Sequence, residues 1–175
     1  FAHRSYLKYQ GWLPHGPNIP MIQQGLSTLP EMLQASGYRT AAIGKYHVGM
    51  SFDNGEGKPA TDFFFRDVDL TKPLLDGPTH HGLSEYFGVT GNTEDPLDTE
   101  PRILIRNDRF TFTDRSRMKM IGTKKREGRI LAAPDWDLRN LGPLYLREAE
   151  SFIDRQSTNE DQPFFLYYVP NANHF

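Results

Sequence analysis

A chain of 175 residues is long enough for one domain with a substantial core and too short for two domains of ordinary size. Hydrophobic residues make up 37% of the chain and charged residues 24%, which excludes a disordered chain, and no apolar run approaches the length that a membrane span needs. The formal net charge of −2 indicates neither nucleic acid nor an acidic membrane as a partner. There is no cysteine, which excludes disulfides, thiolate metal sites and an encoded cysteine nucleophile within these residues.

Both ends of the sequence look cut. The chain opens on "FAHRSY", without an initiator methionine or an apolar leader, and it stops at "NANHF", just after a predicted strand. We therefore expect an internal piece of a longer protein, and the absence of a signal peptide then carries no information.

The first predicted helix and strand follow a loop rich in proline and glycine at residues 11–26. Thr28 is suited to cap a helix, Glu31 lies three residues on as the second half of a capping box, and Gly37 is suited to end the helix. Residues 39–46 then form a run of small and β-branched side chains, which predicts a short buried strand. A helix followed by a strand is the unit of an α/β sheet.

The middle of the chain predicts surface structure. Residues 50–78 are rich in glycine, proline and charged residues and are expected to form a surface excursion, with "DFFFRDVDL" (62–70) as an edge element. Residues 101–113 alternate well enough for a hairpin around "NDR". Residues 115–129 hold seven basic residues and one acid, and we expect a solvated loop there, with contact to an anionic polysaccharide as the alternative.

The C-terminal part predicts a second helix and a second buried strand. The helix is expected over residues 142–156, where an amphipathic stripe comprises Leu144, Leu146, Ala149, Phe152 and Ile153. The run "PFFLYYVP" at 163–170 predicts a central parallel strand buried on both faces. The fold class is therefore α/β, with a mostly parallel central sheet that is flanked by helices and incomplete at both ends.

Polar side chains close the two best strand candidates. Lys45 and His47 end the first, and Asn173 and His174 follow the last. Ligands of open α/β sheets bind beyond the carboxyl ends of the strands. Because side chains alternate along a strand, Lys45 and His47 share one face and Tyr46 points to the other. A cation beside an imidazole suits an anionic, oxygen-rich group, although solvated loop residues would produce the same pattern.

The stretch "GYRTAAIGKYH" (37–47) resembles the second sequence motif of the sulfatases, Gly-Tyr-x-Ser/Thr-x-x-small-Gly-Lys-x-His. Downstream, "HGLSEYFGVTGN" (81–92) is similar to the family's His-Gly-Phe-Asp-x-Phe-Phe-Gly segment, and "QPFFLYYVPNANHF" (162–175) resembles the strand that carries another active-site histidine. The resemblance fades at residues 50–76 and 113–140.

This resemblance implies a hydrolase of sulfate esters in the alkaline-phosphatase-like superfamily. Lys45 would then hold a sulfate oxygen and the oxygen of the nucleophile. His47 would contact the nucleophile and act as a base when sulfate is expelled, and His174 would hold the sulfate and help to protonate the departing alcohol. Fixed cationic donors suit this chemistry because negative charge accumulates on the sulfate and leaving-group oxygens.

The resemblance also implies a formylglycine nucleophile, which is made from Cys or Ser in the pattern Cys/Ser-x-Pro/Ala-x-Arg. No serine of the chain lies in that pattern, but Arg4 can be its arginine and Leu7 the leucine that follows. The nucleophile would then immediately precede Phe1, and a formylglycine-generating or equivalent maturation enzyme is an implied partner. In the other interpretation Arg4 is an ordinary exposed residue at a ragged terminus.

The family's divalent ion, usually calcium, is bound by acidic and amide oxygens, and none of those ligands can be matched here, so no residue is assigned to metal. Residues 1–175 are therefore interpreted as a fragment of one sulfatase-type catalytic domain, inactive alone, with surface excursions at 50–78 and 113–140. The resemblance implies a periplasmic, secreted or lysosomal location and a small-molecule or saccharide sulfate ester as substrate.

Asn92 and Asn173 are candidates for substrate contacts, whereas His80 and His81, adjacent and pointing apart, favour a structural role. Two alternatives to a sulfatase stay open. The first is a phosphomonoester or phosphonate monoester hydrolase on the same scaffold, and the second is a non-catalytic relative that binds sulfated glycans.

Overall fold

A computed structural model of the chain describes residues 20–22, 24–91, 93, 101–123, 126–159 and 161–170. The main sheet consists of five strands: β1 (Arg39–Lys45), β2 (Glu85–Val89), β3 (Ile105–Arg106), β4 (Arg109–Phe110) and β7 (Phe164–Val169). A separate hairpin is formed by β5 (Lys119–Thr123) and β6 (Arg126–Ala132). The helices are α1 (Leu29–Ala35), α2 (Leu141–Ser157) and three 3-10 helices, η2 (Pro78–His81), η3 (Arg115–Arg117) and η4 (Leu138–Asn140).

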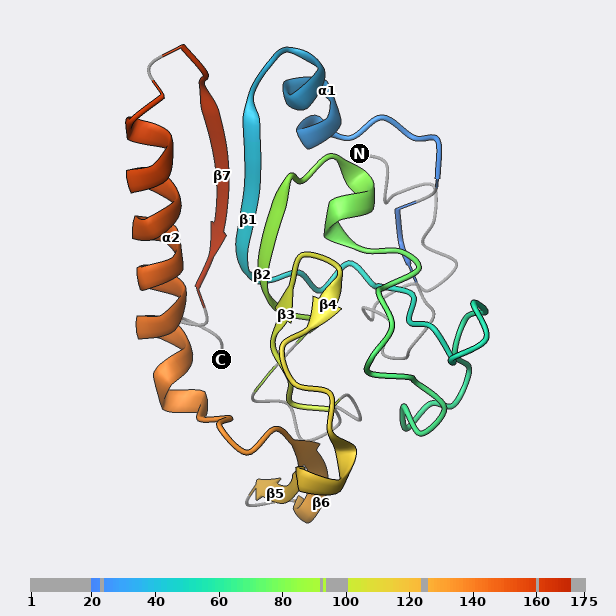
Figure 1. Ribbon diagram of the computed structural model, residues 1–175. Coiled ribbons are helices and arrows are strands. Elements are labelled where there is room, and N and C mark those ends of the chain that lie inside the picture. Colours follow the sequence, from blue (N-terminus) through green and yellow to red (C-terminus); the bar gives the residue numbers. More distant parts are fainter. Residues whose placement is uncertain are drawn as a thin grey trace.

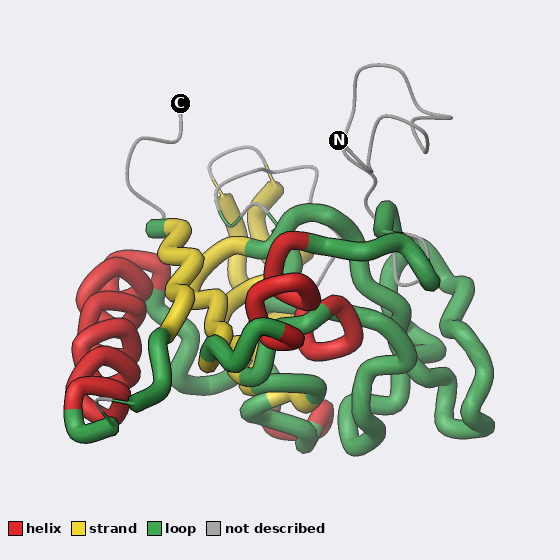
Figure 2. Tube along the Cα trace, turned by 90° about the horizontal axis from the view of Figure 1, so that it is seen from above, coloured by secondary structure: helices red, strands yellow, loops and turns green. Residues whose placement is uncertain are grey.

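The main sheet has the order β4-β3-β2-β1-β7, with β1 at the centre of its parallel part (Figure 1). Strand β1 pairs in parallel with β2 on one side and with β7 on the other, whereas β3 and β4 continue the sheet as an antiparallel hairpin. Helix α2 covers one face of the sheet, and α1 lies on the opposite side (Figure 2). The predicted α/β class with a mostly parallel, helix-flanked sheet is confirmed.

Helix α1 begins and ends as its sequence predicts. The Thr28 side chain accepts a hydrogen bond from the Glu31 backbone, and the Glu31 carboxylate accepts one from the Thr28 N–H. At the other end, Gly37 takes a positive φ of 88°, and the N–H groups of Gly37 and Tyr38 donate to the carbonyls of Gln34 and Leu33. These contacts satisfy the end groups of a helix of seven residues, which is too short to be stable by itself.

Helix α2 lies where it was predicted, but the face that it buries overlaps only in part with the predicted stripe. The residues that it buries against the sheet are Leu141, Tyr145, Ala149 and Phe152. Leu146 and Ile153 of the predicted stripe are 50% and 42% exposed. The predicted stripe was therefore wrong in part. The side chains that face the sheet are spaced by four, four and three residues and include Tyr145, which the predicted stripe omitted.

Strand β7 is parallel to β1, as predicted, but the described part of the sheet places it at an edge. Phe164, Tyr167 and Tyr168 are 38% to 53% exposed. The expectation of a strand buried on both faces is therefore wrong for the described residues. An apolar run cannot by itself distinguish an edge position from a central one.

The excursion between β1 and η2 contains no strand at 62–70, which corrects the predicted edge element. The Asp67 carboxylate accepts hydrogen bonds from the N–H groups of Thr61 and Asp62, so the backbone turns there and does not extend. Phe65 is buried at 1% exposure, and the Arg115 guanidinium donates to the carbonyls of Phe65 and Val68. Burial lowers the pKa of Arg115. The hydrogen bonds of its guanidinium stabilise the fold of the excursion.

The basic stretch 115–129 is not a plain loop, contrary to expectation. It forms η3, strand β5 and the first part of β6, which pair as an antiparallel hairpin with a register shift between Ile121 and Thr123. Apolar residues lie among the basic ones, and Ile121 of this stretch is paired with Ile130 on β6. Such cross-strand pairs stabilise a hairpin, and the count of charged residues did not predict them.

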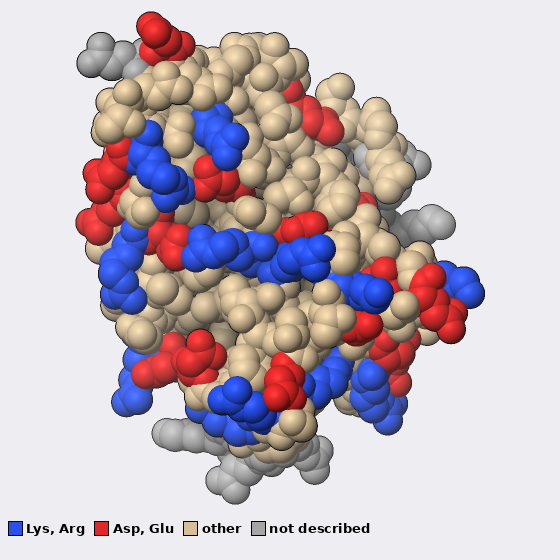
Figure 3. All heavy atoms as spheres, viewed as in Figure 1, with Lys and Arg blue, Asp and Glu red and all other residues tan. Residues whose placement is uncertain are grey.

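Two apolar clusters form the core, one on each face of the sheet. Ala42 and Tyr86 belong to the cluster that the excursion covers, and Ala41, Ile43 and Phe87 belong to the cluster under α2. Basic and acidic side chains are interspersed over the face shown in Figure 3, in keeping with the small net charge. No helix within the described ranges has both the length and the apolar character that a bilayer crossing demands.

Candidate active site

The three parallel strands end at the same edge of the sheet. In the register of the sheet, Lys45 lies opposite Val89 at the end of β2, and Gly44 lies opposite Val169 at the end of β7. Lys45 is partly exposed as the last residue of β1, and His47, two residues further on, is 9% exposed. The carboxyl edge of the sheet therefore presents a cation and an imidazole where α/β proteins bind ligands.

The other predicted site residues lie outside the described residues. These are Arg4, Asn92, Asn173 and His174. The structure therefore brings Lys45 and His47 to one strand end, and the convergence of His174 on them stays a prediction.

Glycines allow the backbones at this edge to approach closely. Gly44 has a φ of 114°, and a Cβ added to it would overlap the backbone carbonyl of Val169. A Cβ added to Gly88 would overlap the carbonyl of Gly44 in the same way. The strand that positions Lys45 is thus packed between β2 and β7 with no room for a side chain at its penultimate residue.

Tyr86 ties the ends of β1 and β2 together. Its buried hydroxyl lies 3.2 Å from the carbonyl oxygen of Gly44 and 2.9 Å from that of Val89, to which the Tyr46 N–H also donates at 3.0 Å. The Tyr46 and Tyr86 rings pack edge to face, with their centroids 5.8 Å apart. The segment between Lys45 and His47 is therefore held by backbone and ring contacts together.

Thr40 joins the beginning of β1 to the segment before β2. Its hydroxyl, which is fully buried, donates to the carbonyl of Gly82 at 2.6 Å and accepts from the N–H of Ser84 at 3.0 Å. The stretches 37–47 and 81–92, two of the three that resemble sulfatase segments, thus contain neighbouring strands, and Thr40 provides hydrogen-bond partners for Gly82 and Ser84.

Replacing Thr40 by valine is expected to lower the free energy of unfolding by about 1–3 kcal/mol, because the isosteric side chain leaves the buried Gly82 carbonyl and the partly buried Ser84 N–H without their partner. Urea unfolding of the purified protein measures the loss. Thr111→Val is the matched control, because the Thr111 hydroxyl bonds to the Leu104 carbonyl at an exposed position. Equal losses in the two variants would contradict the prediction.

A buried acid–imidazole pair lies behind this strand end. His81 Nε2 is 2.6 Å from Asp76 Oδ1, and both residues are 5% exposed. Sequence reasoning favoured a structural role for His81, which the pair bears out, but it did not single out Asp76. No local pattern connects an acid in the excursion with a histidine five residues later, so only the tertiary structure reveals the pair.

A metal site is not found in the part of the chain that the structure describes. The described residues contain no group of three or more His, Asp or Glu side chains that is arranged to hold a metal ion. No described residue is therefore assigned to a metal.

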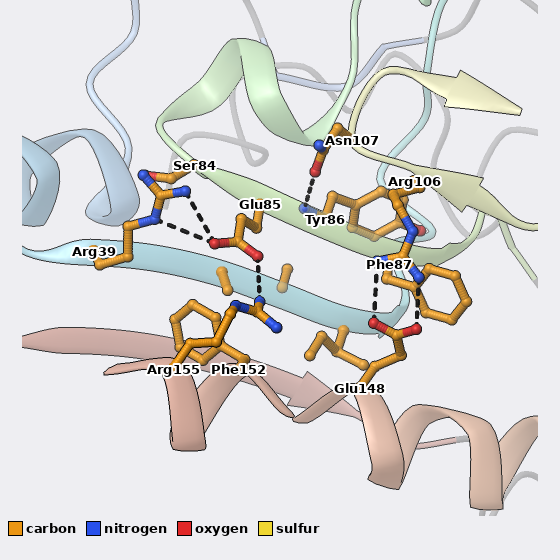
Figure 4. A pocket seen from close by; sticks show the side chains of 13 residues that line it. Arg39, Ser84, Glu85, Tyr86, Phe87, Arg106, Asn107, Glu148, Phe152 and Arg155 are labelled. Atoms are coloured by element: carbon orange, nitrogen blue, oxygen red, sulfur yellow. Dashed lines mark hydrogen bonds and ion pairs between the residues drawn. The ribbon is translucent and has the colours of Figure 1, made fainter. Parts of the chain in front are cut away.

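The cavity in Figure 4 is separate from the strand ends. It has a volume of about 360 Å³ and lies between α2 and the sheet. Glu85 is bonded by Arg39 at 2.9 Å and by Arg155 at 2.7 Å, and Arg106 binds Glu148 at 2.5 Å and 3.1 Å. The charged side chains that line the cavity are therefore paired with one another. Two of these ion pairs, Arg155–Glu85 and Arg106–Glu148, connect α2 to the sheet. Neither Lys45 nor His47 lines it.

The fold and the strand ends define an α/β protein that presents basic and imidazole groups at the carboxyl edge of a parallel sheet. The chain belongs to the sulfatase family, because the family model described as Sulfatase matches residues 2–175.

Curated relatives and solved structures agree with this assignment. The chain is 29% identical to N-acetylgalactosamine-6-sulfatase of Sus scrofa and to that of Homo sapiens over 148 residues, which are 83% of this chain and 22% of each relative. It therefore spans about a fifth of the length of the curated relatives that it matches.

Among solved structures, the Bacteroides thetaiotaomicron protein BT33336S-sulf, described in connection with the metabolism of multiple glycosaminoglycans, matches with a TM-score of 0.68 at 16% identity, over 95% of this chain and 38% of that one. The PsFucS1 sulfatase from Pseudoalteromonas sp. matches with a TM-score of 0.52 at 18% identity, over 85% of this chain and 27% of that one. At such identities these matches show a shared fold.

Proposed function

We propose that the complete protein hydrolyses sulfate esters of saccharides, and that residues 1–175 supply one part of its catalytic domain. The observation that carries this proposal is the position of Lys45 and His47 at the carboxyl edge of parallel strands in a chain of the sulfatase family. The saccharide class is supported by the names of the curated relatives, which act on N-acetylgalactosamine 6-sulfate groups by that description.

In this proposal Lys45 binds a sulfate oxygen and the oxygen of the nucleophile. His47 contacts the nucleophile and removes its proton when sulfate leaves, and His174 protonates the departing alcohol. The Lys45 ammonium stabilises negative charge where it develops in the transition state, which is the largest contribution that such a group can make.

The nucleophile is a formylglycine that a maturation enzyme makes from the residue preceding Phe1, with Arg4 beside it, and Asn92 and Asn173 contact the substrate. Calcium, with its ligands outside residues 1–175, would neutralise sulfate charge when present. Excursions 50–78 and 113–140, where the motif resemblance fades, would select the saccharide, because specificity is carried by loops on a shared scaffold.

The deciding experiment compares an aryl sulfate with the corresponding aryl phosphate as substrates of the complete protein. The proposal expects kcat/KM for the sulfate to exceed that for the phosphate by at least about 100-fold, a difference of roughly 3 kcal/mol in transition-state binding. Mass spectrometry of the peptide that contains Arg4 gives the chemical state of the nucleophile. A preference for phosphate with an unmodified serine or threonine would favour a phosphomonoesterase, and binding of sulfated glycans without turnover would favour a non-catalytic relative.

A further inference from the structure

The Asp76–His81 pair is buried close to Tyr46, the residue between Lys45 and His47, and His81 and Tyr46 line one cavity. The two side chains are 7% and 6% exposed, and the distance of 2.6 Å between Oδ1 and Nε2 is that of a strong hydrogen bond. Because the carboxylate accepts, Nε2 carries the hydrogen. A buried carboxylate is costly without such a donor, so each member of the pair depends on the other.

Asp76 is connected through its backbone to the continuation of β1. The Ser51 N–H donates to the Asp76 carbonyl at 2.9 Å, and the Ser51 carbonyl accepts from the N–H groups of Leu75 at 2.9 Å and Asp76 at 3.3 Å. Ser51 lies only four residues after His47. Asp76 is therefore held against the segment that follows His47.

Asp76 also acts electrostatically on the residue between the two candidate catalytic groups. Burial raises the pKa of the Tyr46 phenol, and the negative charge of Asp76 raises it further. Tyr46 packs against the core cluster that the excursion covers, so Asp76 approaches the strand end from the side opposite to the face of Lys45.

His81 is held from the other direction by α1. The Thr28 hydroxyl, which belongs to the cap of α1, donates to the His81 carbonyl at 2.8 Å. The next residue, Gly82, has a φ of 81° and approaches the backbone of Glu31 so closely that a Cβ there would overlap it. Helix α1 and η2 thus form a fixed support, and the pair connects this support to the loop that follows His47.

We propose that the Asp76–His81 pair is a positioning device, which holds the segment from Lys45 to His47 in place through Tyr46 and Ser51 without touching substrate. This role rests on the proposed function, because it assumes that Lys45 and His47 act on substrate. A displacement of about 1 Å that is caused by a change far from the reacting atoms can lower activity about 100-fold.

The test uses the complete protein with His81→Ala, His81→Gln and Asp76→Asn. For His81→Ala, kcat on an aryl sulfate is expected to fall about 10- to 100-fold with KM changed less than about threefold. His81→Gln restores most of kcat, because the glutamine amide reaches the position of Nε2 and donates to the same carboxylate. Asp76→Asn keeps a hydrogen-bond acceptor without the charge and is expected to lie between the two.

Phe152→Ala is the matched control for a general loss of stability, because Phe152 is 1% exposed in the core cluster on the α2 face. It is expected to lower the melting temperature without changing kcat per folded molecule. The inference is overturned if the kcat of His81→Ala is normal once corrected for the folded fraction, or if His81→Gln is no more active than His81→Ala while both are folded.

A second readout separates this inference from the proposed function. The imidazole NMR resonances of His47, assigned by their absence in His47→Ala, are expected to shift in His81→Ala and to return in His81→Gln, whether or not the protein hydrolyses sulfate esters. Unchanged His47 resonances in a folded His81→Ala variant contradict the positioning role. Failure to hydrolyse any sulfate ester contradicts the proposed function alone.

Discussion

Replacing Lys45 or His47 by alanine is expected to lower kcat/KM of the complete protein for an aryl sulfate by about 100- to 1,000-fold. Lys45 ends the central parallel strand, and its backbone is fixed by pairing with β2, so its ammonium meets the sulfate without reorganisation. The loss of Lys45 is expected mainly in kcat, because charge on the sulfate oxygens increases in the transition state. Steady-state kinetics with a chromogenic sulfate measures both effects.

Lys58→Ala and His80→Ala are the matched controls, since both side chains are exposed and neither residue belongs to a strand. Both controls are expected to leave kcat/KM unchanged. If the Lys45 and His47 variants hydrolysed the sulfate as fast as the parent, the assignment of the strand end as the active site would be wrong.

Gly44→Ala is expected to destabilise the protein by about 3 kcal/mol or more, one of the largest effects for a single methyl group. The added Cβ would overlap the carbonyl of Val169, which is backbone and cannot rotate away, in a residue whose φ of 114° already disfavours any side chain. Relief requires β1 and β7 to separate at the edge where Lys45 is held. Urea unfolding followed by circular dichroism measures the loss.

Gly37→Ala separates the two causes of this effect. Gly37 has a φ of 88°, but a Cβ there would meet no atom within 4 Å, so its replacement is expected to cost only about 1–2 kcal/mol from backbone strain. The difference between the variants is the cost of the collision with Val169. A Gly44→Ala variant that is no less stable than Gly37→Ala would show that β1 and β7 are free to move apart.

Local chemistry explains which parts of the fold could be predicted. The capping box of Thr28 and Glu31 and the glycine at residue 37 specify both ends of α1 through contacts between residues three to five apart. The hairpin of β3 and β4 likewise turns at Asn107, whose φ is 58°. Sequence patterns succeed here because the determining contacts are short-range.

The predictions that failed concern long-range packing. The face that α2 buries depends on where β1 and β2 lie, and the sheet accepts Tyr145 and leaves Leu146 exposed. Residues 62–70 predict an edge element, but the Asp67 carboxylate and the buried Phe65 hold them in turns. Strand β7 is apolar throughout and nevertheless lies at the edge of the described sheet.

The sequence by itself determined the family, the α/β class, the caps of α1 and the candidate pair Lys45 and His47, because motif spacing and capping are encoded by neighbouring residues. Only the tertiary structure decided that Gly44 and Gly88 bring backbones into contact, and that Asp76 and His81 meet behind the strand end. Such contacts join residues whose proximity arises from the packing of the sheet with its loops. No periodicity along the chain specifies that packing.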